Sequence, residues 1–502
     1  MLSPVPRPAV EVPESRTARM KFLRSALLIA ITAACLSATS AAAATVPTWR
    51  AARYASLPAG GTTIPSGYLP ALSCPSAGNC VAGGDYAGAN GVVKGLILNE
   101  IDGTWRSSLT IIAPVNAAAS AGLTPSSVSC GSNGNCALVG SYLDRSGNTQ
   151  GFVDVEVRGV WARAHDVALP VNAARKGQNA LLRSIDCSSA GNCSAVGDYL
   201  DNATPQPRNE GFVLDQVAGR WRRGAEVRLP ARVNANPFVA IGQLACASVG
   251  NCSAVGTYID ANDVTQGLTV DEVRGAWRAG ASLDLPGNAN AFAGVTLASV
   301  TCTKPGRCTA IGSYETVSGA LQGLATSQSS GRWDRAVELQ MPLGAQTNPH
   351  VFFYGFADIA CPGVNDCSAG GLYRDSAGKF QGFFVNERHG TWQPASELQL
   401  PSTSLMAGHN GGVVSVSCVS VGNCSGGAAY LDAAGNYQAS IVNEVGGVWR
   451  NATKLALPAG AVSVGVDGGV YGLICPTRGE CTAVGSYLKG ASTYEGFTVS
   501  TK

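Results

Sequence analysis

Residues 181–200 read LLRSIDCSSAGNCSAVGDYL, and this stretch decides the fold. Cys187 and Cys193 flank a turn that contains Gly191, and Tyr199 follows six residues after the second cysteine. The same arrangement recurs eight times, with first cysteines 56 to 59 residues apart. A repeat of this length is typical of solenoids and propellers.

The repeat is marked by cysteine pairs, tyrosines and tryptophans in fixed registers. The cysteine pairs are Cys74/Cys80, Cys130/Cys136, Cys187/Cys193, Cys246/Cys252, Cys302/Cys308, Cys361/Cys367, Cys418/Cys424 and Cys475/Cys481. The tyrosines are Tyr86, Tyr142, Tyr199, Tyr258, Tyr314, Tyr373, Tyr430 and Tyr487. The tryptophans are Trp49, Trp105, Trp161, Trp221, Trp277, Trp333, Trp392 and Trp449. Repeats begin near residues 71, 127, 184, 243, 299, 358, 415 and 472.

Each repeat is predicted to form four antiparallel strands. The first strand ends at the first cysteine (181–187), and the second runs from the second cysteine through the tyrosine (193–200). The third carries a Gly-Phe-Val pattern (151–157), and the fourth carries the tryptophan and ends in Leu-Pro (161–170). Short apolar and aromatic runs bounded by Gly, Asn, Asp and Pro are typical of strands. Four strands at this period predict the blade of a propeller.

The two ends of the chain predict a closed ring. Trp49 opens a fourth strand with no strands before it, whereas the last repeat stops after its third strand. The N-terminal strand therefore supplies what the last repeat lacks, and closure removes open sheet edges. The prediction is an all-β chain that folds as a single eight-bladed β-propeller over residues 45–502, closed by its N-terminal strand.

The cysteines are predicted to pair within each hairpin. The residue two before the second cysteine is glycine in seven repeats and Asn365 in the sixth, as a positive-φ turn requires. Such a turn brings the two sulfurs together. Metal ligation is the alternative. Removing Cys35 with the expected export signal leaves sixteen of the seventeen cysteines, and an even number in an exported chain favours disulfides. No metal or cofactor is predicted.

Other recurring residues are interpreted as structural. The tyrosines and tryptophans could stack on carbohydrate, but their recurrence in every blade favours a role in packing. A glutamate five residues before the tryptophan suggests a contact between the third and fourth strands, and glutamine replaces it twice. This position is held by Glu100, Glu156, Gln216, Glu272, Gln328, Glu387 and Glu444. The hairpin loosely resembles the Asp-box of sialidase-type propellers, but its spacing is shorter and its aspartate irregular, so no sialidase active site is implied.

An aspartate two residues after the tyrosine recurs in five repeats. Calcium binding is one interpretation of these loops. A hairpin turn is the simpler one, because Asp, Gly and Asn dominate turns and a calcium site needs six or more oxygen ligands. The aspartates are Asp144, Asp201, Asp260, Asp375 and Asp432.

The first 44 residues are interpreted as a signal peptide. Basic residues precede an apolar run that ends at Cys35, and small residues follow it, while translation could start at Met20. The apolar run is too short to span a membrane. Cys35 offers a lipid-anchor alternative, but Thr32 stands where such signals favour leucine. The chain is therefore expected to be secreted and extracellular.

The charge balance argues against polyanionic partners. The full chain has 35 Lys and Arg against 33 Asp and Glu, and removing the five basic and two acidic residues of the first 44 leaves 30 against 31. No polybasic tail is present, so neither nucleic acid nor an anionic membrane is an expected partner. The mature chain is expected to be a monomer.

Functional residues should break the repeat, because structural residues obey it. His350 and His409 lie in successive connections from the fourth strand to the next first strand, and Asp467 lies in the following one. Asn348 and Tyr354 flank His350, so these five residues form the candidate ligand-binding site. No triad, phosphate loop or paired-carboxylate motif is present, and no catalytic residue is assigned.

Two functions follow as hypotheses. The first is a non-catalytic binding or scaffold module for an extracellular glycan, peptide or surface protein. The alternative is a secreted hydrolase or lyase with its site in the axial funnel. Fold alone does not decide between them, because propellers host many chemistries.

Overall fold

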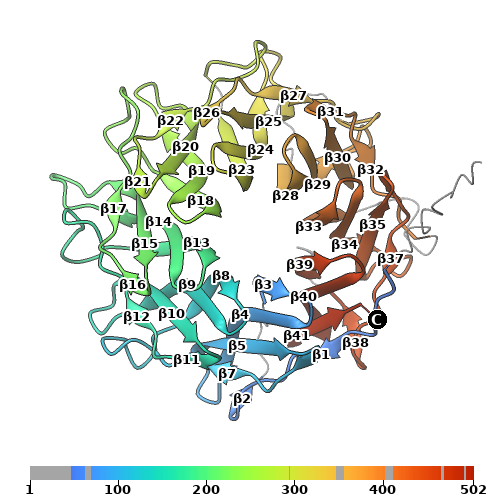
Figure 1. Ribbon diagram of the computed structural model, residues 1–502, viewed down its shortest axis with the longest axis horizontal. Coiled ribbons are helices and arrows are strands. Elements are labelled where there is room, and N and C mark those ends of the chain that lie inside the picture. Colours follow the sequence, from blue (N-terminus) through green and yellow to red (C-terminus); the bar gives the residue numbers. More distant parts are fainter. Residues whose placement is uncertain are drawn as a thin grey trace, which may run out of the picture. The chain divides into compact units, whose positions relative to one another are not determined.

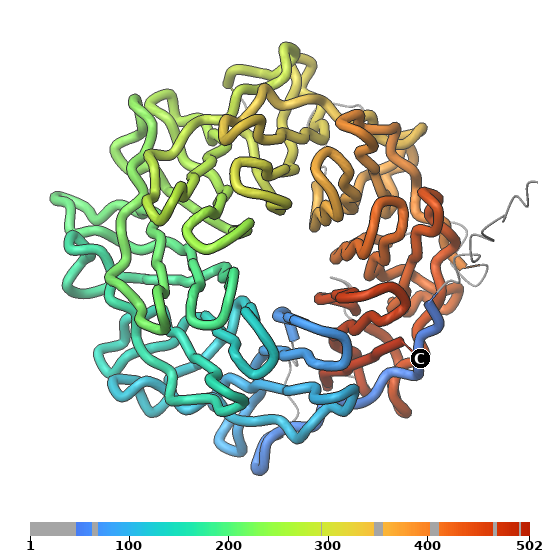
Figure 2. Tube along the Cα trace, in the orientation of Figure 1, coloured from blue at the N-terminus to red at the C-terminus, as the bar shows by residue number. Residues whose placement is uncertain are grey.

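The computed structural model describes residues 47–62, 69–292, 294–345, 355–401, 411–464, 469–490 and 493–501, all within the compact unit Ala44–Lys502. Eight four-stranded antiparallel blades surround a channel, as predicted (Figure 1). The chain passes from blade to blade in sequence order (Figure 2). None of these segments contains a helix long and apolar enough to cross a membrane. Blades 1 to 8 are numbered here by the order of their cysteine pairs.

The innermost strand of each blade lines the channel and contains a β-bulge. In blade 3 the register shifts between Leu182 and Ser184. The strand approaches its neighbour so closely there that a Cβ atom at Gly197 would lie 1.9 Å from the carbonyl oxygen of Leu181. Glycine relieves this crowding in blade 3, whereas blade 7 holds Ala428 opposite Val413 at the equivalent bulge. The innermost strands are β3 (Ala71–Ser76), β8 (Thr124–Ser132), β13 (Leu181–Ser189), β18 (Ala240–Ser248), β23 (Val295–Lys304), β28 (Gly355–Gly363), β33 (Gly412–Ser420) and β39 (Val470–Thr477).

The second and third strands form the buried centre of each blade. The second strands are β4 (Asn79–Gly88), β9 (Asn135–Leu143), β14 (Asn192–Leu200), β19 (Asn251–Ile259), β24 (Arg307–Glu315), β29 (Asp366–Arg374), β34 (Asn423–Leu431) and β40 (Glu480–Lys489). The third strands are β5 (Val93–Ile101), β10 (Thr149–Val157), β15 (Asn209–Val217), β20 (Thr265–Val273), β25 (Leu321–Ser329), β30 (Phe380–Arg388), β35 (Tyr437–Val445) and β41 (Thr493–Ser500). Both faces of these strands pack against neighbouring blades, so most of their residues are buried, as in β14 and β15.

The outer strand is broken into two segments in the first seven blades, although one continuous strand was predicted. Between the segments the backbone bonds to the preceding blade, because the Ala164 amide donates to the Ile112 carbonyl (3.0 Å) and the Gly224 amide to the Ala168 carbonyl (2.7 Å). The first segments are β6 (Thr104–Trp105), β11 (Val160–Trp161), β16 (Arg220–Trp221), β21 (Ala276–Trp277), β26 (Arg332–Trp333), β31 (Thr391–Trp392) and β36 (Val448–Trp449). The second segments are β7 (Leu109–Thr110), β12 (His165–Asp166), β17 (Ala225–Glu226), β22 (Ala281–Ser282), β27 (Val337–Leu339), β32 (Ser396–Glu397) and β37 (Thr453–Lys454).

The N-terminal segment lies beside the last blade. Strand β1 (Arg53–Tyr54) pairs with β41, with Arg53 opposite Thr498 (Figure 1). Two further short strands, β2 (Gly61–Thr62) and β38 (Ala461–Ser463), extend blades 1 and 8 by pairing with β4 and β40. Strand β1 thus occupies the place that the sequence assigns to it. That it holds the ring closed stays a prediction.

The hydrophobic core lies between neighbouring blades. Between blades 2 and 3, for example, Val139 and Val153 pack with Leu182 and Phe212. The eight repeat tyrosines are all at most 3% exposed. Their burial excludes them as carbohydrate platforms in this structure and confirms the packing interpretation.

The ring has two different faces. The hairpin face carries the turns between the first and second strands and between the third and fourth strands. The loop face carries the connections between the second and third strands and those from the outer strand to the next blade. On the hairpin face the Gly219 amide donates to the Gly191 carbonyl (2.8 Å), and on the loop face Ala173 pairs with Asp201.

All eight predicted cysteine pairs are disulfides near the hairpin face. The turn residue two before the second cysteine has positive φ, +72° at Gly191 and +64° at Asn365. Glycine and asparagine are the residues that tolerate this conformation. The bridges are Cys74–Cys80, Cys130–Cys136, Cys187–Cys193, Cys246–Cys252, Cys302–Cys308, Cys361–Cys367, Cys418–Cys424 and Cys475–Cys481.

The second cysteine of each bridge belongs to the core and not to a surface site. It begins the second strand, which neighbouring blades cover on both faces, and its residue is at most 5% exposed in every blade. A ligand cannot reach these sulfurs, so their role is limited to crosslinking and packing. The buried cysteines are Cys80, Cys136, Cys193, Cys252, Cys308, Cys367, Cys424 and Cys481.

Candidate functional site

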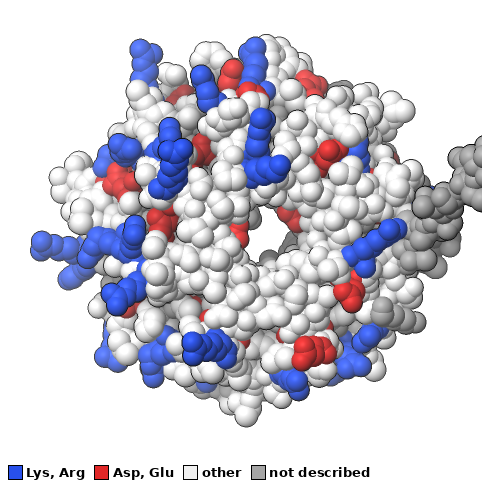
Figure 3. Space-filling view, viewed as in Figure 1, with Lys and Arg blue, Asp and Glu red and all other residues white. Residues whose placement is uncertain are grey.

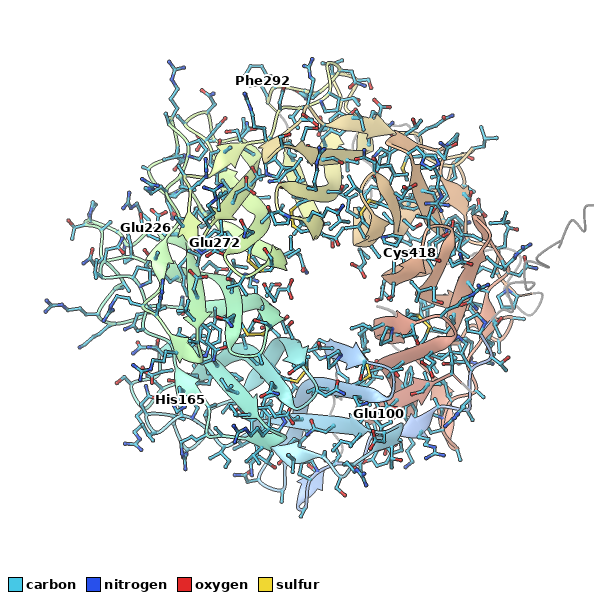
Figure 4. All side chains as sticks on the ribbon, in the orientation of Figure 1. Glu100, His165, Glu226, Glu272, Phe292 and Cys418 are labelled. Atoms are coloured by element: carbon cyan, nitrogen blue, oxygen red, sulfur yellow. A yellow bond between two sulfur atoms is a disulfide. The ribbon has the colours of Figure 1, made fainter. Side chains whose placement is uncertain are left out.

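The five candidate site residues predicted from the sequence lie outside the described residues. They are Asn348, His350, Tyr354, His409 and Asp467. The other two histidines are exposed and stand apart. His165 lies on the outer side of blade 2 (Figure 4), and His389 lies in a turn of the hairpin face. A binding site at the five predicted residues therefore stays a prediction.

The axial channel is a concave feature that the described residues form. A cavity of about 520 Å³ in it is lined by innermost strands, with Gln243, Thr301, Asp358, Ser415 and Tyr471 among its polar residues. Figure 3 shows the channel open, with Asp and Glu atoms at its edge. Its lining is thus polar.

Two aspartates of the innermost strands hold blades together. Asp358 accepts hydrogen bonds from the Val416 amide (2.9 Å) of blade 7 and from the Ser299 hydroxyl (3.4 Å) of blade 5. Asp186 accepts from the Cys246 amide (2.7 Å) of blade 4. Burial raises the pKa of Asp358 to about 6, although these hydrogen bonds oppose the shift. Both carboxylates therefore serve as hydrogen-bond acceptors that join neighbouring blades.

Hydroxyl groups play the same part in other blades. The residue just before the first cysteine accepts a hydrogen bond from the first cysteine's amide in the next blade. Ser73 accepts from Cys130 (3.0 Å), Ser129 from Cys187 (2.9 Å) and Ser417 from Cys475 (3.0 Å). Sequence reasoning missed this network. Its signal was the recurrence of small polar residues at one position before the cysteine.

The repeated glutamates also join blades. Glu156 lies opposite Trp161 across the third and outer strands, as predicted, and it also accepts a hydrogen bond from Asn99 of blade 1 (3.4 Å). Burial raises the pKa of Glu272 and of Glu387 to about 7, and in each case a nearby aspartate carboxylate adds to the shift. These buried acids are structural parts of the interface between blades.

Four of the tryptophans, Trp161, Trp277, Trp333 and Trp449, bond to the preceding blade through one position of its third strand. The Trp277 Nε1 atom donates to Asp215 (3.0 Å), and the Trp449 Nε1 atom donates to Asn386 (3.2 Å). The buried Trp221 Nε1 atom has no partner among the described residues. The reason is that an apolar residue, valine 155, holds the corresponding position in blade 2.

The aspartates after the repeat tyrosines form turns. Asp260 accepts hydrogen bonds from the Asn262 amide (2.8 Å), the Val264 amide (3.1 Å) and the Gln266 side chain (3.0 Å). Burial raises the pKa of Asp260, but these hydrogen bonds outweigh burial and lower the pKa below its usual value. Among the described residues, no group of three or more His, Cys, Asp or Glu is arranged to hold a metal. The contacts match the turn interpretation.

The connections on the loop face expose large apolar side chains. Val115, Val171 and Leu343 each follow the proline that ends an outer strand, and they are 71%, 88% and 97% exposed. Phe292, in the connection from blade 4 to blade 5, is also largely exposed and lies on the outer side of the ring (Figure 4). By contrast, the asparagines of these connections are anchored, since Asn116 accepts a hydrogen bond from the repeat tyrosine of blade 2 (2.8 Å).

No protein-family model matches the chain, and no curated protein matches it. Among solved structures, a protein of unknown function from Dyadobacter fermentans is 11% identical, covers 78% of this chain and 97% of its own, and has a TM-score of 0.39. An ulvan lyase, a polysaccharide lyase, is 10% identical, covers 77% and 92%, and has a TM-score of 0.41. A fucose-recognising six-bladed lectin from Aleuria aurantia is 13% identical, covers 66% and 95%, and has a TM-score of 0.32. This chain is similar to propellers with several activities, and the similarities do not distinguish between them.

Proposed function

We propose that the chain is a secreted, monomeric and non-catalytic binding or scaffold module for an extracellular glycan, peptide or surface protein. We also propose that it binds through the loop face. Eight disulfides indicate an oxidising, extracellular environment. The signal-like N-terminal sequence supports export to such a compartment.

The exposure of apolar side chains in equivalent connections carries this proposal. Val115, Val171 and Leu343 occupy one position in three different blades, and they are among the most exposed large apolar side chains of the described residues. Exposed apolar residues that recur on one surface provide contact area for a partner.

The chemistry of the channel supports binding rather than catalysis. Asp186 and Asp358 are the carboxylates that the described inner strands place there, and both accept hydrogen bonds from backbone amides of other blades. A general acid or base needs a proton position that substrate can reach. Groups committed to the frame of the ring cannot exchange protons freely without weakening it.

The proposal is tested with arrays of glycans and cell-surface proteins, followed by a triple variant of the loop face, Val115→Ser, Val171→Ser and Leu343→Ser. The control is a triple serine variant of the hairpin face at Val160, Val249 and Val448, because these valines are also exposed. We expect the loop-face variant to weaken binding at least tenfold and the control to leave it unchanged.

Equal binding by the loop-face variant, or equal losses in both variants, would contradict the proposal. A hydrolase and lyase screen of any captured glycan runs in parallel. Turnover of that glycan would favour the enzymatic alternative over a binding module.

A further inference from the structure

One outer strand carries an unusual density of arginine. Residues 219–232 contain five arginines and one acidic residue, Glu226. All five are exposed. Figure 3 shows Lys and Arg side chains gathered over the side of the ring where Figure 1 places β16 and β17. The five arginines are Arg220, Arg222, Arg223, Arg228 and Arg232.

Arg223 has a structural role that recurs in other blades. Its guanidinium donates to the Leu169 carbonyl of the preceding blade (2.8 Å). Arg163 and Arg335 hold the same position after their tryptophans and make the equivalent bonds, at 2.6 and 2.7 Å. Arg223 is therefore explained by the repeat. The remaining four form what we call the arginine strip.

Arg228 departs most from the repeat, and Arg220 recurs once among the outer strands, as Arg332 of blade 5. The position of Arg220 holds threonine and valine in the first two blades, and the position of Arg228 holds isoleucine and alanine. In the described part of the chain, the guanidinium groups of Arg220, Arg228 and Arg232 make no hydrogen bond or ion pair. Packing and blade geometry thus do not account for these side chains.

Among the described residues, Glu226 forms no ion pair with the arginine strip and bonds to neutral groups instead. The Glu226 carboxylate accepts hydrogen bonds from the Tyr199 hydroxyl (2.9 Å) and from Asn172. Arg222 acts on buried Glu272 in blade 4 and opposes the rise of its pKa. Arg222 is therefore partly engaged, whereas the other three members of the arginine strip remain available to a ligand.

We propose that the arginine strip binds an acidic polysaccharide through its carboxylate groups, along the outer edge of blade 3. Guanidinium groups bind carboxylates with paired hydrogen bonds. Arg220 and Arg228 are eight residues apart, which sets an upper limit of about 26 Å at roughly 3.3 Å per residue. The break between β16 and β17 shortens this span. A row of separate cations of this length fits a linear polymer with spaced carboxylates.

Duplex nucleic acid fits the arginine strip less well. DNA carries about one charge per 1.7 Å of its axis, so tight binding needs many cations over a broad surface. The arginine strip offers one row of four. An oxidising extracellular environment also favours a polysaccharide over nucleic acid. This site goes beyond the proposed loop-face function, because Arg220, Arg222 and Arg228 precede the loop-face connection that holds Arg232. It also uses charge instead of apolar contact.

The test measures binding of the full chain to polygalacturonate at several salt concentrations, with neutral dextran, dextran sulfate and duplex DNA as comparison probes. The variant is Arg220→Gln with Arg228→Gln. The matched control is Arg106→Gln with Arg332→Gln, which removes two exposed arginines from the outer strands of blades 1 and 5. We expect the arginine-strip variant to lose affinity for polygalacturonate at least tenfold and to show a weaker salt dependence.

The control pair and neutral dextran distinguish a site from general charge attraction. We expect the control pair to bind polygalacturonate as the parent does, and dextran not to bind. Equal losses in the two variants, unchanged binding by the arginine-strip variant, or tighter binding of dextran sulfate or DNA than of polygalacturonate would overturn the proposal. The loop-face triple variant should retain polygalacturonate binding, so the two proposals can fail separately.

Discussion

The hairpin face and the loop face are built from the same eight repeats but use them differently. On the hairpin face each blade has a disulfide and a positive-φ turn residue, and buried glutamates lie just inside it. On the loop face the aspartate turns recur in only five repeats, and the residue after the outer-strand proline varies from Gly287 to Leu343. The hairpin face holds its residues nearly constant from blade to blade and crosslinks each blade. The loop face varies in sequence, as surfaces that recognise a partner do.

Two carboxyls near the hairpin face and two on the loop face have pKa values shifted in opposite directions. Near the hairpin face, burial raises the pKa of Glu272 and Glu387 to about 7. On the loop face, hydrogen bonds outweigh burial and lower the pKa values of Asp144 and Asp260. These two glutamates therefore resist ionisation, whereas the two turn aspartates favour it. Raised values are not confined to the hairpin side, because burial also raises the pKa of Glu210 to about 7.

Removing residues 45–58 should have the largest effect on both faces, because it tests whether either face keeps its structure without a complete ring. The truncation deletes β1 and leaves the edge of β41 unpaired. We expect a loss of cooperative unfolding and a fall in Tm of many degrees, measured by calorimetry. An unchanged Tm would show that the N-terminal strand does not close the ring.

Paired glycine replacements sharpen the comparison. A Cβ at Gly250 on the hairpin face would lie 2.7 Å from the Gly275 amide nitrogen, whereas a Cβ at Gly147 on the loop face meets nothing within 4 Å. Both replaced glycines have positive φ. Chemical denaturation should show a loss of about 3 kcal/mol for Gly250→Ala and of about 1 kcal/mol for Gly147→Ala. Equal losses would mean that close packing at the hairpin turn does not contribute to the free energy of unfolding.

Removing one disulfide measures how far a single blade depends on its crosslink. The double variant Cys187→Ala with Cys193→Ala should lower the free energy of unfolding by about 2 kcal/mol, as expected for so short a loop. The remaining blades should keep their structure, because each bridge closes only its own hairpin. Peptide mapping under non-reducing conditions provides the control. Bridges between repeats would contradict local pairing.

A pair of isosteric replacements tests the opposite pKa shifts. The unfolded chain ionises Glu387 near pH 4.5, whereas the native state resists ionisation until about pH 7, so this carboxyl costs stability progressively between the two values. Glu387→Gln should therefore stabilise the protein by about 2 kcal/mol at pH 8 and not at pH 4. Asp260→Asn should destabilise it at pH 7, and the difference should vanish at a pH below the lowered pKa of Asp260.

The matched pH series contains its own control. Gln216 and Gln328 already hold the position of Glu387 in blades 3 and 5, so glutamine fits there. Stability curves of Glu387→Gln and the parent that run parallel from pH 4 to 8 would show that this carboxyl does not titrate with a raised pKa.

The sequence predicted the features that depend on residues within a single repeat. Cysteine spacing with Gly191 between predicted the hairpin disulfide, and the recurrence of Tyr199 predicted a buried aromatic. It did not predict the bulge between Leu182 and Ser184 or the break in the outer strand near Ala164. Both arise where backbone groups bond to or crowd a neighbouring strand, and such contacts leave no period in the sequence.

The candidate sites show a similar division. The role of Asp358 depends on Val416 and Ser299, which are 58 and 59 positions away and in different blades. Single repeats cannot reveal such a contact. The arginine strip was hidden by the near-neutral total charge, because that total does not show where charges lie. The site around His350 and His409 stays a prediction.

The pairing of β1 with β41 also constrains how the chain can fold as it is made. Every disulfide joins cysteines six positions apart, so each hairpin can oxidise soon after it is synthesised. The partners Arg53 and Thr498, in contrast, are 445 positions apart (498 minus 53). Contacts of such long range form slowly and late. The first segment of the chain must therefore remain unpaired until the last blade has been synthesised. Throughout that time the exposed edges of β1 and blade 1 could pair with a strand of another copy of the chain, which would cause misassembly.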